Sequence, residues 1–499
     1  MSRVPYVPGF ARADEETPSA KARGRALRER LPRAEQAALR IAPDRPDAVA
    51  EVEKSNAGRL PELTPIRVGR MAASPFAFLR GSAGLMAHDL AASPVTGIGA
   101  QLCGDAHAAN FGLYGDALGG LVIDLNDFDE TVYGPWEWDA KRLATSIVLA
   151  GREAGAGEDD CHTAARDAAG AYRRTIRLLA KLPVTDAWNA IVDEELVSHT
   201  DARDLLGTLE RVAAKARKNT SARFAAKSTE QGPDGGRRFV DAPPVLRRVP
   251  DAEAATVATA LAGYLETLPE DRHPLLARYA VHDVAFRVVG TGSVGLRSYV
   301  VLLLDHRGEP LVLQVKEARP SVLAPFVAKA GFPVPPVAHE GRRVVLGQRR
   351  MQVVSDVLLG WATMPDGEGG GGGDGPGTAS DGSGDGVGPG SGDTGLPDGR
   401  GPGRPFQVRQ FRNRKGSVDP ARLSAAQLDD YARMTGALLA RAHAHSADPR
   451  VLAGYCGKGE ELEEAIARFA VAYADRTEAD HAVLVAAVRS GRIAAESGV

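Results

Sequence analysis

The residue types best suited to chemistry in this sequence are concentrated in one stretch, residues 101–130. This stretch carries carboxylates, an amide and an imidazole within 25 positions: Asp105, His107, Asn110, Asp124, Asp127 and Asp129. Two apolar, strand-like runs surround Gly-rich loops, and glycine allows a backbone to turn tightly. The pattern indicates a catalytic loop followed by a strand whose end binds a metal ion.

The first motif is Asp105-Ala-His107-Ala-Ala-Asn110. Phosphotransferase catalytic loops also place an Asp and an Asn five residues apart. In such a loop Asp105 would orient or deprotonate the attacking hydroxyl, and the carbonyl oxygen of Asn110 would help to hold Mg²⁺, a cation that prefers oxygen ligands. Asp105 and His107 are therefore the candidate catalytic residues, with His107 shaping the loop. The spacing alone is common by chance, and its place ahead of an apolar strand ending in acids makes it more specific.

The second motif is that strand end, Val122-Ile123-Asp124-Leu-Asn126-Asp127-Phe-Asp129-Glu130. Kinase-type sites present their main metal ligand in this way, and so many carboxylates together repel one another unless a cation compensates. We favour Asp124 as the main metal ligand because it follows Asn110 by the length of a short hairpin. Asp127 is a second ligand or a loop anchor. The alternative is a solvated acidic turn without a metal.

The third motif is Gly290-Thr-Gly292-Ser293-Val-Gly295, which a strand-like run follows instead of the helix that a dinucleotide fingerprint requires. A Gly-rich hairpin over phosphates is the kinase alternative, and Lys316 on the next strand would contact the α- and β-phosphates. A plain hairpin and a solvent-facing Lys316 remain the simpler explanation. Glu317 points to the opposite strand face, and Glu340 is only a candidate partner for Lys316.

Two further groups have two interpretations each. His443 and His445 could ligate a metal from a strand, but on a helix these positions do not share a face, which favours a capping or loop-orienting role. Arg67, Arg70 and Arg80 lie among apolar residues. They form ion pairs that hold down a loop, or one of them faces an anionic ligand.

Hydrophobic periodicity predicts the elements that position these residues. We expect helices over residues 134–154, 158–182, 186–218, 251–268, 423–446 and 459–489. Three strands are expected between residues 281 and 318, followed by another strand pair, or a strand and a helix, over 341–361. Residues 365–405 are mostly Gly, Asp, Pro and Ser, which predicts a disordered insertion in a loop between two paired segments.

Composition excludes several classes of protein. The net charge of −3 implies no bulk polyanion such as a nucleic acid as partner, and no apolar run is long enough for a membrane span. Three widely spaced cysteines without a CxxC pair argue against structural zinc and a disulfide framework. We find no secretory signal and expect a cytoplasmic protein.

The quoted motifs also carry a resemblance. Through RMAASPFAFLRG, CGDAHAANFG, NDFDETVYGPWEWDAKRLATS, LQVKEA and GQRRMQ, the chain resembles the bacterial DUF2252 family of unknown function from about residue 40 to 450. These motifs are in turn similar to aminoglycoside-phosphotransferase-like and choline-kinase-like enzymes. The resemblance matches Asp105, His107 and Asn110 to their catalytic loop and Asp124 to their strand end. It places Asp139 in the position that supports the loop.

Two departures from these enzymes matter. Cys103 stands where their loop begins with a His, and the motif order is inverted, since the Gly-rich hairpin and Lys316 follow the catalytic loop. The helix at 423–446 resembles the one that normally leads into that loop. All three facts fit a circularly permuted kinase-like fold, which is feasible where termini lie close together at the surface.

We therefore expect an α+β protein with two kinase-like lobes. The expected parts are a peripheral segment (1–58), a helical catalytic-loop part (59–280), a β-rich nucleotide-binding part (281–364), the insertion (365–405) and a C-terminal helical part (406–499). The expected activity is Mg²⁺-dependent transfer of the γ-phosphoryl group of ATP to a hydroxyl of a small molecule. The alternatives are a metal-dependent hydrolase that uses His443 or His445 together with His107, and a pseudokinase that binds without turnover.

Overall fold

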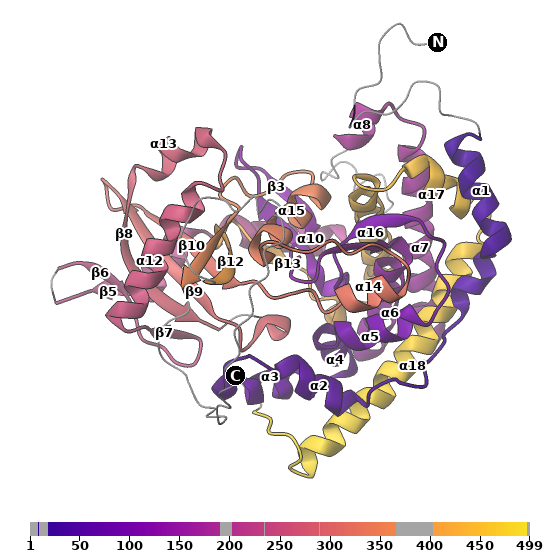
Figure 1. Cartoon of the computed structure of the whole chain (residues 1–499), viewed down its shortest axis with the longest axis horizontal. Helices are drawn as coiled ribbons and strands as arrows, with labels where there is room; N and C mark the ends of the chain where they lie inside the picture. The colour runs from indigo at the N-terminus through magenta and orange to yellow at the C-terminus, as the bar shows by residue number, and fades with distance from the viewer. Residues whose placement is uncertain are drawn as a thin grey trace, which may run out of the picture.

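A computed structural model describes residues 8, 18–189, 202–233, 235–288, 290–365 and 403–496. The chain forms a mixed α+β structure with a helical part and a β-rich part side by side (Figure 1). The α+β class expected from the sequence is confirmed. The expected disordered insertion lies almost wholly outside the described residues. None of the described helices combines the length and apolar character needed to cross a bilayer.

The helical part is built around α6, in which every residue from Trp136 to Gly151 is buried. Its neighbours α7, α16 and α18 pack around it and share one large hydrophobic core. Helix α16 begins with a capping box between Ser424 and Gln427, in which each side chain bonds the other's backbone. The helices of this part are α1 (Ala20–Arg30), α6 (Trp136–Glu153), α7 (Glu158–Leu179), α8 (Val184–Trp188), α16 (Ala425–Ala444), α17 (Pro449–Cys456) and α18 (Glu461–Arg489).

Two small antiparallel sheets carry the catalytic-loop stretch on the inner side of the helical part. One pairs β1 with β4, and the other has the order β13-β2-β3. The hairpin expected between Asn110 and Asp124 is therefore present, formed by β2 and β3. The strands are β1 (Gly99–Leu102), β2 (Phe111–Gly115), β3 (Leu121–Leu125), β4 (Val132–Pro135) and β13 (Gly416–Ser417).

The β-rich part is a six-stranded antiparallel sheet of order β11-β12-β10-β9-β8-β7. Alternate residues of β8, β9 and β10 enter two separate hydrophobic cores, so both sheet faces are covered. The strands are β7 (Leu246–Arg248), β8 (Tyr279–Arg287), β9 (Ser298–Asp305), β10 (Pro310–Glu317), β11 (Gly360–Pro365) and β12 (Gly403–Gln410). Since β11 pairs with β12, the insertion does connect two paired strands.

Several helices and a small hairpin accompany this sheet. Helix α12 contacts β11 and β8, and α11 contacts β10. The β-rich part therefore includes β7, α12 and α13, which the sequence had assigned to the helical part. These elements are α11 (Ser221–Ser228), α12 (Asp251–Leu265), α13 (His273–Leu276), α15 (Glu340–Met351), β5 (Thr229–Gln231) and β6 (Arg237–Phe239). Two other helices lie against the helical part and its small sheets: α10 (Leu206–Arg217) contacts β2 and β13, and α14 (Ala324–Lys329) contacts α5 and β4.

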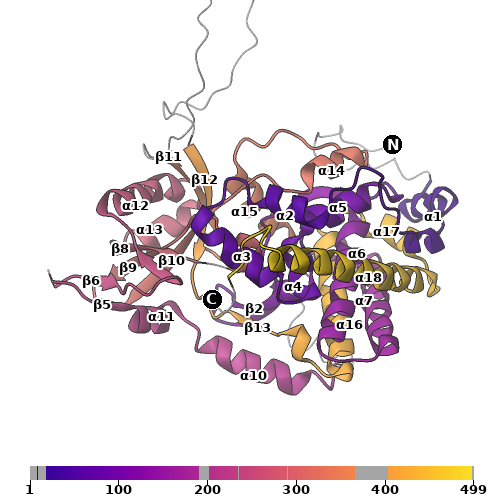
Figure 2. The ribbon, with the colours of Figure 1, turned by 90° about the horizontal axis from the view of Figure 1, so that it is seen from below.

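A layer of short helices joins the two parts (Figure 2). Helices α2 and α4 contact α18 of the helical part, while α3 and α4 contact the Gly-rich connection between β8 and β9. The layer consists of α2 (Ala48–Asn56), α3 (Thr64–Met71), α4 (Pro75–Gly81) and α5 (Ala83–Ala91). It brings the N-terminal segment to the junction between the two parts.

Candidate functional site

The catalytic loop leaves β1 and turns sharply at Gly104. This residue has a φ of +85°, and a Cβ atom there would lie 2.2 Å from the carbonyl oxygen of Glu130. Glycine meets both conditions without a clash. The loop then enters a 3₁₀ turn that ends at Asn110 and runs directly into β2. Asp105 and Asn110 therefore lie on one short loop.

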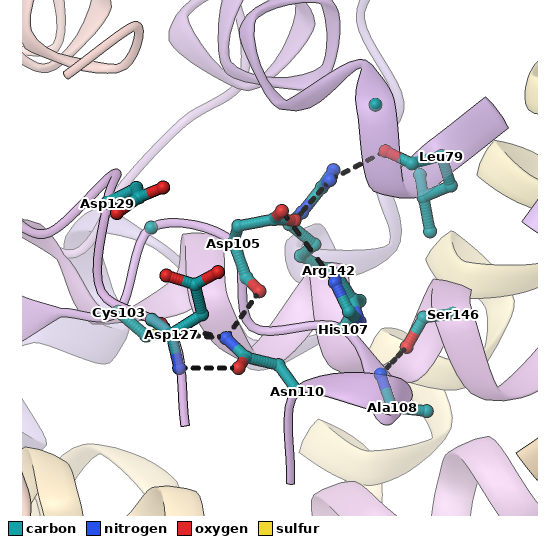
Figure 3. Close-up of polar contacts among 12 residues, drawn as sticks. Leu79, Cys103, Asp105, His107, Ala108, Asn110, Asp127, Asp129, Arg142 and Ser146 are labelled. Carbon is teal, nitrogen blue, oxygen red and sulfur yellow. Dashed lines mark hydrogen bonds and ion pairs between the residues drawn. The ribbon is translucent and has the colours of Figure 1, made fainter. Parts of the chain in front are cut away.

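Helix α6 supports this loop from behind. The carboxylate of Asp139 accepts hydrogen bonds from the backbone N–H groups of Cys103 at 2.7 Å and Gly104 at 3.0 Å. The hydroxyl of Ser146 accepts one from the N–H of Ala108 at 2.8 Å (Figure 3). Through these bonds Asp139 and Ser146 hold the backbone of the loop in place.

The two histidines of the HxH pair do not form a metal site with His107. The ring nitrogens of His443 contact the Tyr172 hydroxyl at 2.9 Å and the Asp139 carboxylate at 3.3 Å. His445 contacts the backbone carbonyls of Arg350 and Trp188. His443 thus orients the residue that holds the catalytic loop, as the helical spacing favoured. The convergence that a hydrolase would require is not found.

Asp105 faces the cleft between the two parts, with 22% of its side chain exposed. Arg142 of α6 donates from Nε to Asp105 Oδ1 at 2.6 Å and from Nη2 to the Leu79 carbonyl at 2.7 Å (Figure 3). Nε2 of His107 lies 3.7 Å from Oδ2, which is too long for a hydrogen bond. Arg142 therefore fixes one carboxylate oxygen and leaves the other for a ligand.

His107 lines the same cleft and is 8% exposed. Burial lowers the pKa of His107 to about 4, so the imidazole is neutral at pH 7. Its Nδ1 is buried without a hydrogen-bond partner among the described residues, and its ring packs edge-on against Phe76. A neutral, edge-packed ring agrees with the loop-shaping role expected for it.

Asp124 is not part of the cleft, which corrects its assignment as the main metal ligand. Its side chain is 1% exposed, and its two oxygens accept from Nη2 of Arg441 on α16 at 2.7 and 2.6 Å. The reason is its place within β3, where it faces α16. The expectation that Lys316 would meet Asp124 is wrong.

Asp127, just past the end of β3, lies beside Lys316, where the sequence analysis had expected Asp124. Lys316 Nζ lies 2.5 Å from Asp129 Oδ2 and 3.6 Å from Asp127 Oδ1. Asn110 holds this turn, because its Oδ1 accepts the N–H of Asp127 at 2.8 Å and its Nδ2 donates to the Asp127 carbonyl at 2.9 Å. The Asp127 side chain is 49% exposed and available to a ligand.

The electrostatics of Asp127 favour the charged carboxylate. Burial within the cleft alone would raise its pKa, but the positive charges of Lys316, Arg409 and Lys415 lower it below the usual value. Burial, reinforced by Arg409, lowers the pKa of Lys415 to about 7. These neighbouring positive charges thus favour the ionised form of the Asp127 carboxyl.

The Gly-rich segment connects β8 to β9 and lies over these carboxylates. The Ser293 hydroxyl donates to Asp129 Oδ2 at 3.0 Å. The far end of the segment is fixed to the short-helix layer, since the Leu60 N–H donates to the Gly295 carbonyl at 2.8 Å. A strand follows, so the segment is a hairpin connection and not a dinucleotide fingerprint. Gly290, Gly292 and Ser293 line the cleft.

Neither acidic candidate partner of Lys316 is used. Glu317 pairs with Arg297 at 3.4 Å, and Glu340 pairs with Arg343 one turn along α15. Within the described chain, Lys316 pairs with Asp127 and Asp129 instead.

One cleft of about 630 Å³ gathers these groups from residues far apart in the sequence. A cleft of this size suits a small-molecule or cofactor ligand. Its catalytic and acidic wall contains Asp105, His107, Asn110, Asp127 and Asp129, and its β-rich wall contains Gly290, Gly292 and Ser293.

Comparison with known proteins gives one match. The family described as "Uncharacterized protein conserved in bacteria (DUF2252)" matches residues 59–371 and 390–487. The chain belongs to the DUF2252 family. No curated protein and no solved structure matches it. In this DUF2252 protein, most of the residues that line the cleft lie within the matched ranges, while those contributed by α2 precede them.

Sequence reasoning missed several residues that lie in the cleft or directly behind it in this DUF2252 protein. Asp129 was visible as part of the acidic run, but nothing in the run distinguished it from a solvated turn. Arg142 follows Asp139 by one helical turn, a spacing that places both on one face of α6. Arg409 reaches the site because β12 pairs with β10, which aligns it with Gln314. Such a pairing is not readable from a single segment.

The Asp139 contacts lead to a stability prediction. We expect Asp139→Ala to lower the free energy of unfolding by about 2 kcal/mol, because two backbone N–H groups lose their acceptor in a buried site. Urea titration would measure this change. The matched control, Asp475→Ala, removes only a largely exposed partner of Arg152 and should change stability by less than about 1 kcal/mol. Equal losses in the two variants would argue against the support role.

Proposed function

We propose that this DUF2252 protein is a phosphotransferase that moves the γ-phosphoryl group of ATP to a hydroxyl of a small molecule, with Mg²⁺. The observation that carries the proposal is the pairing of Lys316 with Asp129 and Asp127 beside the Asp105 loop. Kinase-type chemistry needs these groups together: a phosphate-binding Lys, metal-binding carboxylates and an Asp for the nucleophile.

The order of elements in the β-rich part supports the same proposal. Counting from β8, a Gly-rich segment joins the first two strands, the Lys lies on the third, and helix α15 comes before the remaining strands. Protein kinases likewise carry the Lys on their third strand beneath a Gly-rich loop. We infer a kinase-like fold whose two halves are circularly permuted in the chain.

The residues present fit Mg²⁺ and a nucleotide. The carboxylates of Asp127 and Asp129 offer the oxygen donors that Mg²⁺ prefers, while the Asn110 side-chain oxygen, expected to be a ligand, instead accepts the Asp127 N–H and holds the turn between them. Lys316 and the backbone of the Gly-rich segment would hold the phosphates. Bound Mg²⁺ would neutralise negative charge on the transferred group.

The chain's own residues would act mainly by positioning and electrostatics. Asp105 would accept the proton of the attacking hydroxyl at Oδ2 while Arg142 holds Oδ1. Asn110 keeps the Asp127 turn in register with the catalytic loop. Neutral His107 adds no charge near Asp105 and keeps the loop shape.

One observation favours a second candidate, a nucleotide-binding pseudokinase. Lys316 lacks a glutamate partner from α15, and active protein kinases require such an ion pair. A protein of this kind would bind Mg-ATP without forming ADP.

The first test is Mg-ATP binding to the full chain by calorimetry. We expect wild-type binding that requires Mg²⁺, and a loss of affinity of at least about tenfold in Lys316→Gln, because the variant loses a charge-assisted contact to phosphate. The control, Lys329→Gln, changes an exposed lysine of α14 that pairs with Asp44, and should bind normally. No binding of Mg-ATP to the wild-type protein would reject both the phosphotransferase and the nucleotide-binding pseudokinase.

A further inference from the structure

One wall of the cleft carries a group of basic side chains that the proposed function does not use. The wall is formed by α2–α5 and the residues after β10, and its basic members are Lys54, Arg59, Arg67, Arg80 and Arg319. We call these five residues the arginine wall. Two of them, Arg67 and Arg80, were already unusual in the sequence.

Arg67 is 2% exposed and has no carboxylate partner within the described chain. It donates to Ser55 Oγ at 3.0 Å, Asn56 Oδ1 at 2.7 Å and the Gly81 carbonyl at 2.9 Å. Its Nε is buried without a hydrogen-bond partner in this part of the structure. A buried guanidinium held only by neutral groups leaves its positive charge uncompensated at the cleft wall.

Arg80 also lacks a carboxylate partner among the described residues, and its Nε is buried without an acceptor. Its guanidinium lies 5.8 Å from the ring centre of Phe76, which also contacts His107. The ion-pair interpretation of the sequence is therefore wrong for Arg67 and Arg80. Arg67 is buried and Arg80 is half-buried, and neither has a carboxylate partner among the described residues, which is unusual for a charged side chain removed from water.

The arginines also repel one another. Burial, together with the charge of Arg319, lowers the pKa of Arg59 to about 10. Burial lowers the pKa of Arg67, and Arg59 and Arg319 add to this effect. Uncompensated like charges at one wall destabilise the folded protein, and a bound anion would remove that repulsion.

The wall includes a helix N-terminus as a second source of positive potential. Residues 82–85, at the start of α5, line the cleft. The N-cap Ser82 does not cap this helix with its side chain, because its hydroxyl donates to the Phe78 carbonyl. First-turn N–H groups of a helix bind anions, and here the buried Arg67 donates to Gly81 next to them.

The acidic residues of this region offset the positive charge of the wall only in part, through Glu130, Glu317 and Glu51. Glu317 pairs with Arg297, and Glu130 accepts the N–H of Val322 at 2.7 Å. Glu51 of α2 lines the wall beside Gly84, and burial raises the pKa of its carboxyl. Basic groups therefore outnumber acidic ones along the wall.

We propose that the arginine wall binds a phosphate group of the phosphoryl acceptor, so that the acceptor is a small phosphorylated alcohol. This inference rests on the proposed phosphotransferase function. Several arginines from separate elements suit a dianion with three acceptor oxygens better than a carboxylate with two. Arg142 links the wall to the reacting groups, since it contacts both Asp105 and the Leu79 carbonyl, adjacent to Arg80.

The reaction balances with these groups. The acceptor hydroxyl gives its proton to Asp105 and forms a new O–P bond to the γ-phosphorus of ATP. The bond between that phosphorus and the β–γ bridging oxygen breaks, and its electron pair leaves with ADP. The arginine wall fixes the other end of the acceptor and takes no part in the bond changes.

The test is calorimetric titration of the full chain with inorganic phosphate, glycerol 3-phosphate, glycerol and acetate, without Mg²⁺. We expect the two phosphates to bind, and Arg80→Gln and Arg319→Gln each to weaken this binding by about tenfold or more. Mg-ATP affinity should change less than about twofold in the same variants. The control, Arg468→Gln, changes an exposed arginine of α18 and should match wild type. Circular dichroism would confirm that each variant is folded.

Three results would overturn the inference. If Arg80→Gln and Arg319→Gln both bound phosphate as tightly as wild type, the arginine wall would not be the phosphate site. If Lys316→Gln lost phosphate binding and Arg80→Gln kept it, phosphate would be binding at the proposed site for the ATP phosphates. Acetate binding as tightly as phosphate would reject a phosphorylated acceptor. If phosphate binds through Arg80 but Mg-ATP does not bind wild type, the phosphotransferase function and the acceptor role both fail, while the anion site stands.

Discussion

Asp105→Asn is expected to lower the rate of ADP formation from Mg-ATP by about 10²–10⁴-fold, the usual contribution of a positioned general base. The amide keeps the size of the carboxylate but cannot take the proton of an attacking hydroxyl. Mg-ATP affinity should change less than about threefold, because the Lys316 cluster does not include Asp105. ADP release measured with glycerol 3-phosphate as acceptor would give the rate.

The surroundings of Asp105 make this substitution informative. Arg142 can still donate to the side-chain amide oxygen that the Asp105→Asn variant carries, so the loop should keep its position. The control, Asp271→Asn, removes the charge of a mostly exposed carboxylate beside Arg272 and should leave the rate unchanged. Turnover of Asp105→Asn at the wild-type rate would remove Asp105 from the chemistry. Mg-ATP binding without ADP formation in the wild-type protein would favour the pseudokinase.

Local patterns predicted much of the fold. The apolar runs of β9 and β10, which are buried along almost their whole length, and the helical period of α6 and α16 are each readable from a short window of sequence. The pairing of β11 with β12 across the insertion was also predictable, since the apolar runs resume on either side. The helix over 340–351 was one of two possibilities, and the sequence did not decide between them.

The site was less predictable because its contacts join distant segments. Spacing counted from Asn110 favoured Asp124 as the metal ligand. In the structure the Asp124 carboxylate accepts hydrogen bonds from Arg441 on α16, a residue more than 300 positions later in the chain. The residue count does not show where a hairpin ends or which helix covers its strand. Of the arginine wall, only Arg67 and Arg80 were visible in the sequence, as basic residues in an apolar context.

Asp124 and Asp127 differ in burial, and this difference predicts a large effect of substituting Asp124 on stability. We expect Asp124→Asn to lower the free energy of unfolding by about 3–5 kcal/mol, because it leaves the charge of Arg441 buried and uncompensated. Arg441→Met should cause a similar loss of stability, since it leaves the Asp124 carboxylate buried without its ion-pair partner. The double variant Asp124→Leu with Arg441→Met should recover much of the stability, because no buried charge remains. Urea titrations of the three variants would measure these terms.

Asp127→Asn should show the opposite behaviour, since the Asp127 carboxylate is half-exposed and its buried partner, Lys316, keeps the closer ion pair with Asp129 at 2.5 Å. Its stability should stay within about 1 kcal/mol of wild type, while the Mg²⁺ dependence of ATP binding should be lost. Asp124→Asn, studied at a temperature where it remains folded, should keep that dependence. Loss of Mg²⁺-dependent binding in Asp124→Asn, with normal stability, would restore Asp124 as the metal ligand. Because stability and metal dependence are measured separately, each carboxylate is tested for both roles, and a structural aspartate cannot be mistaken for a ligand.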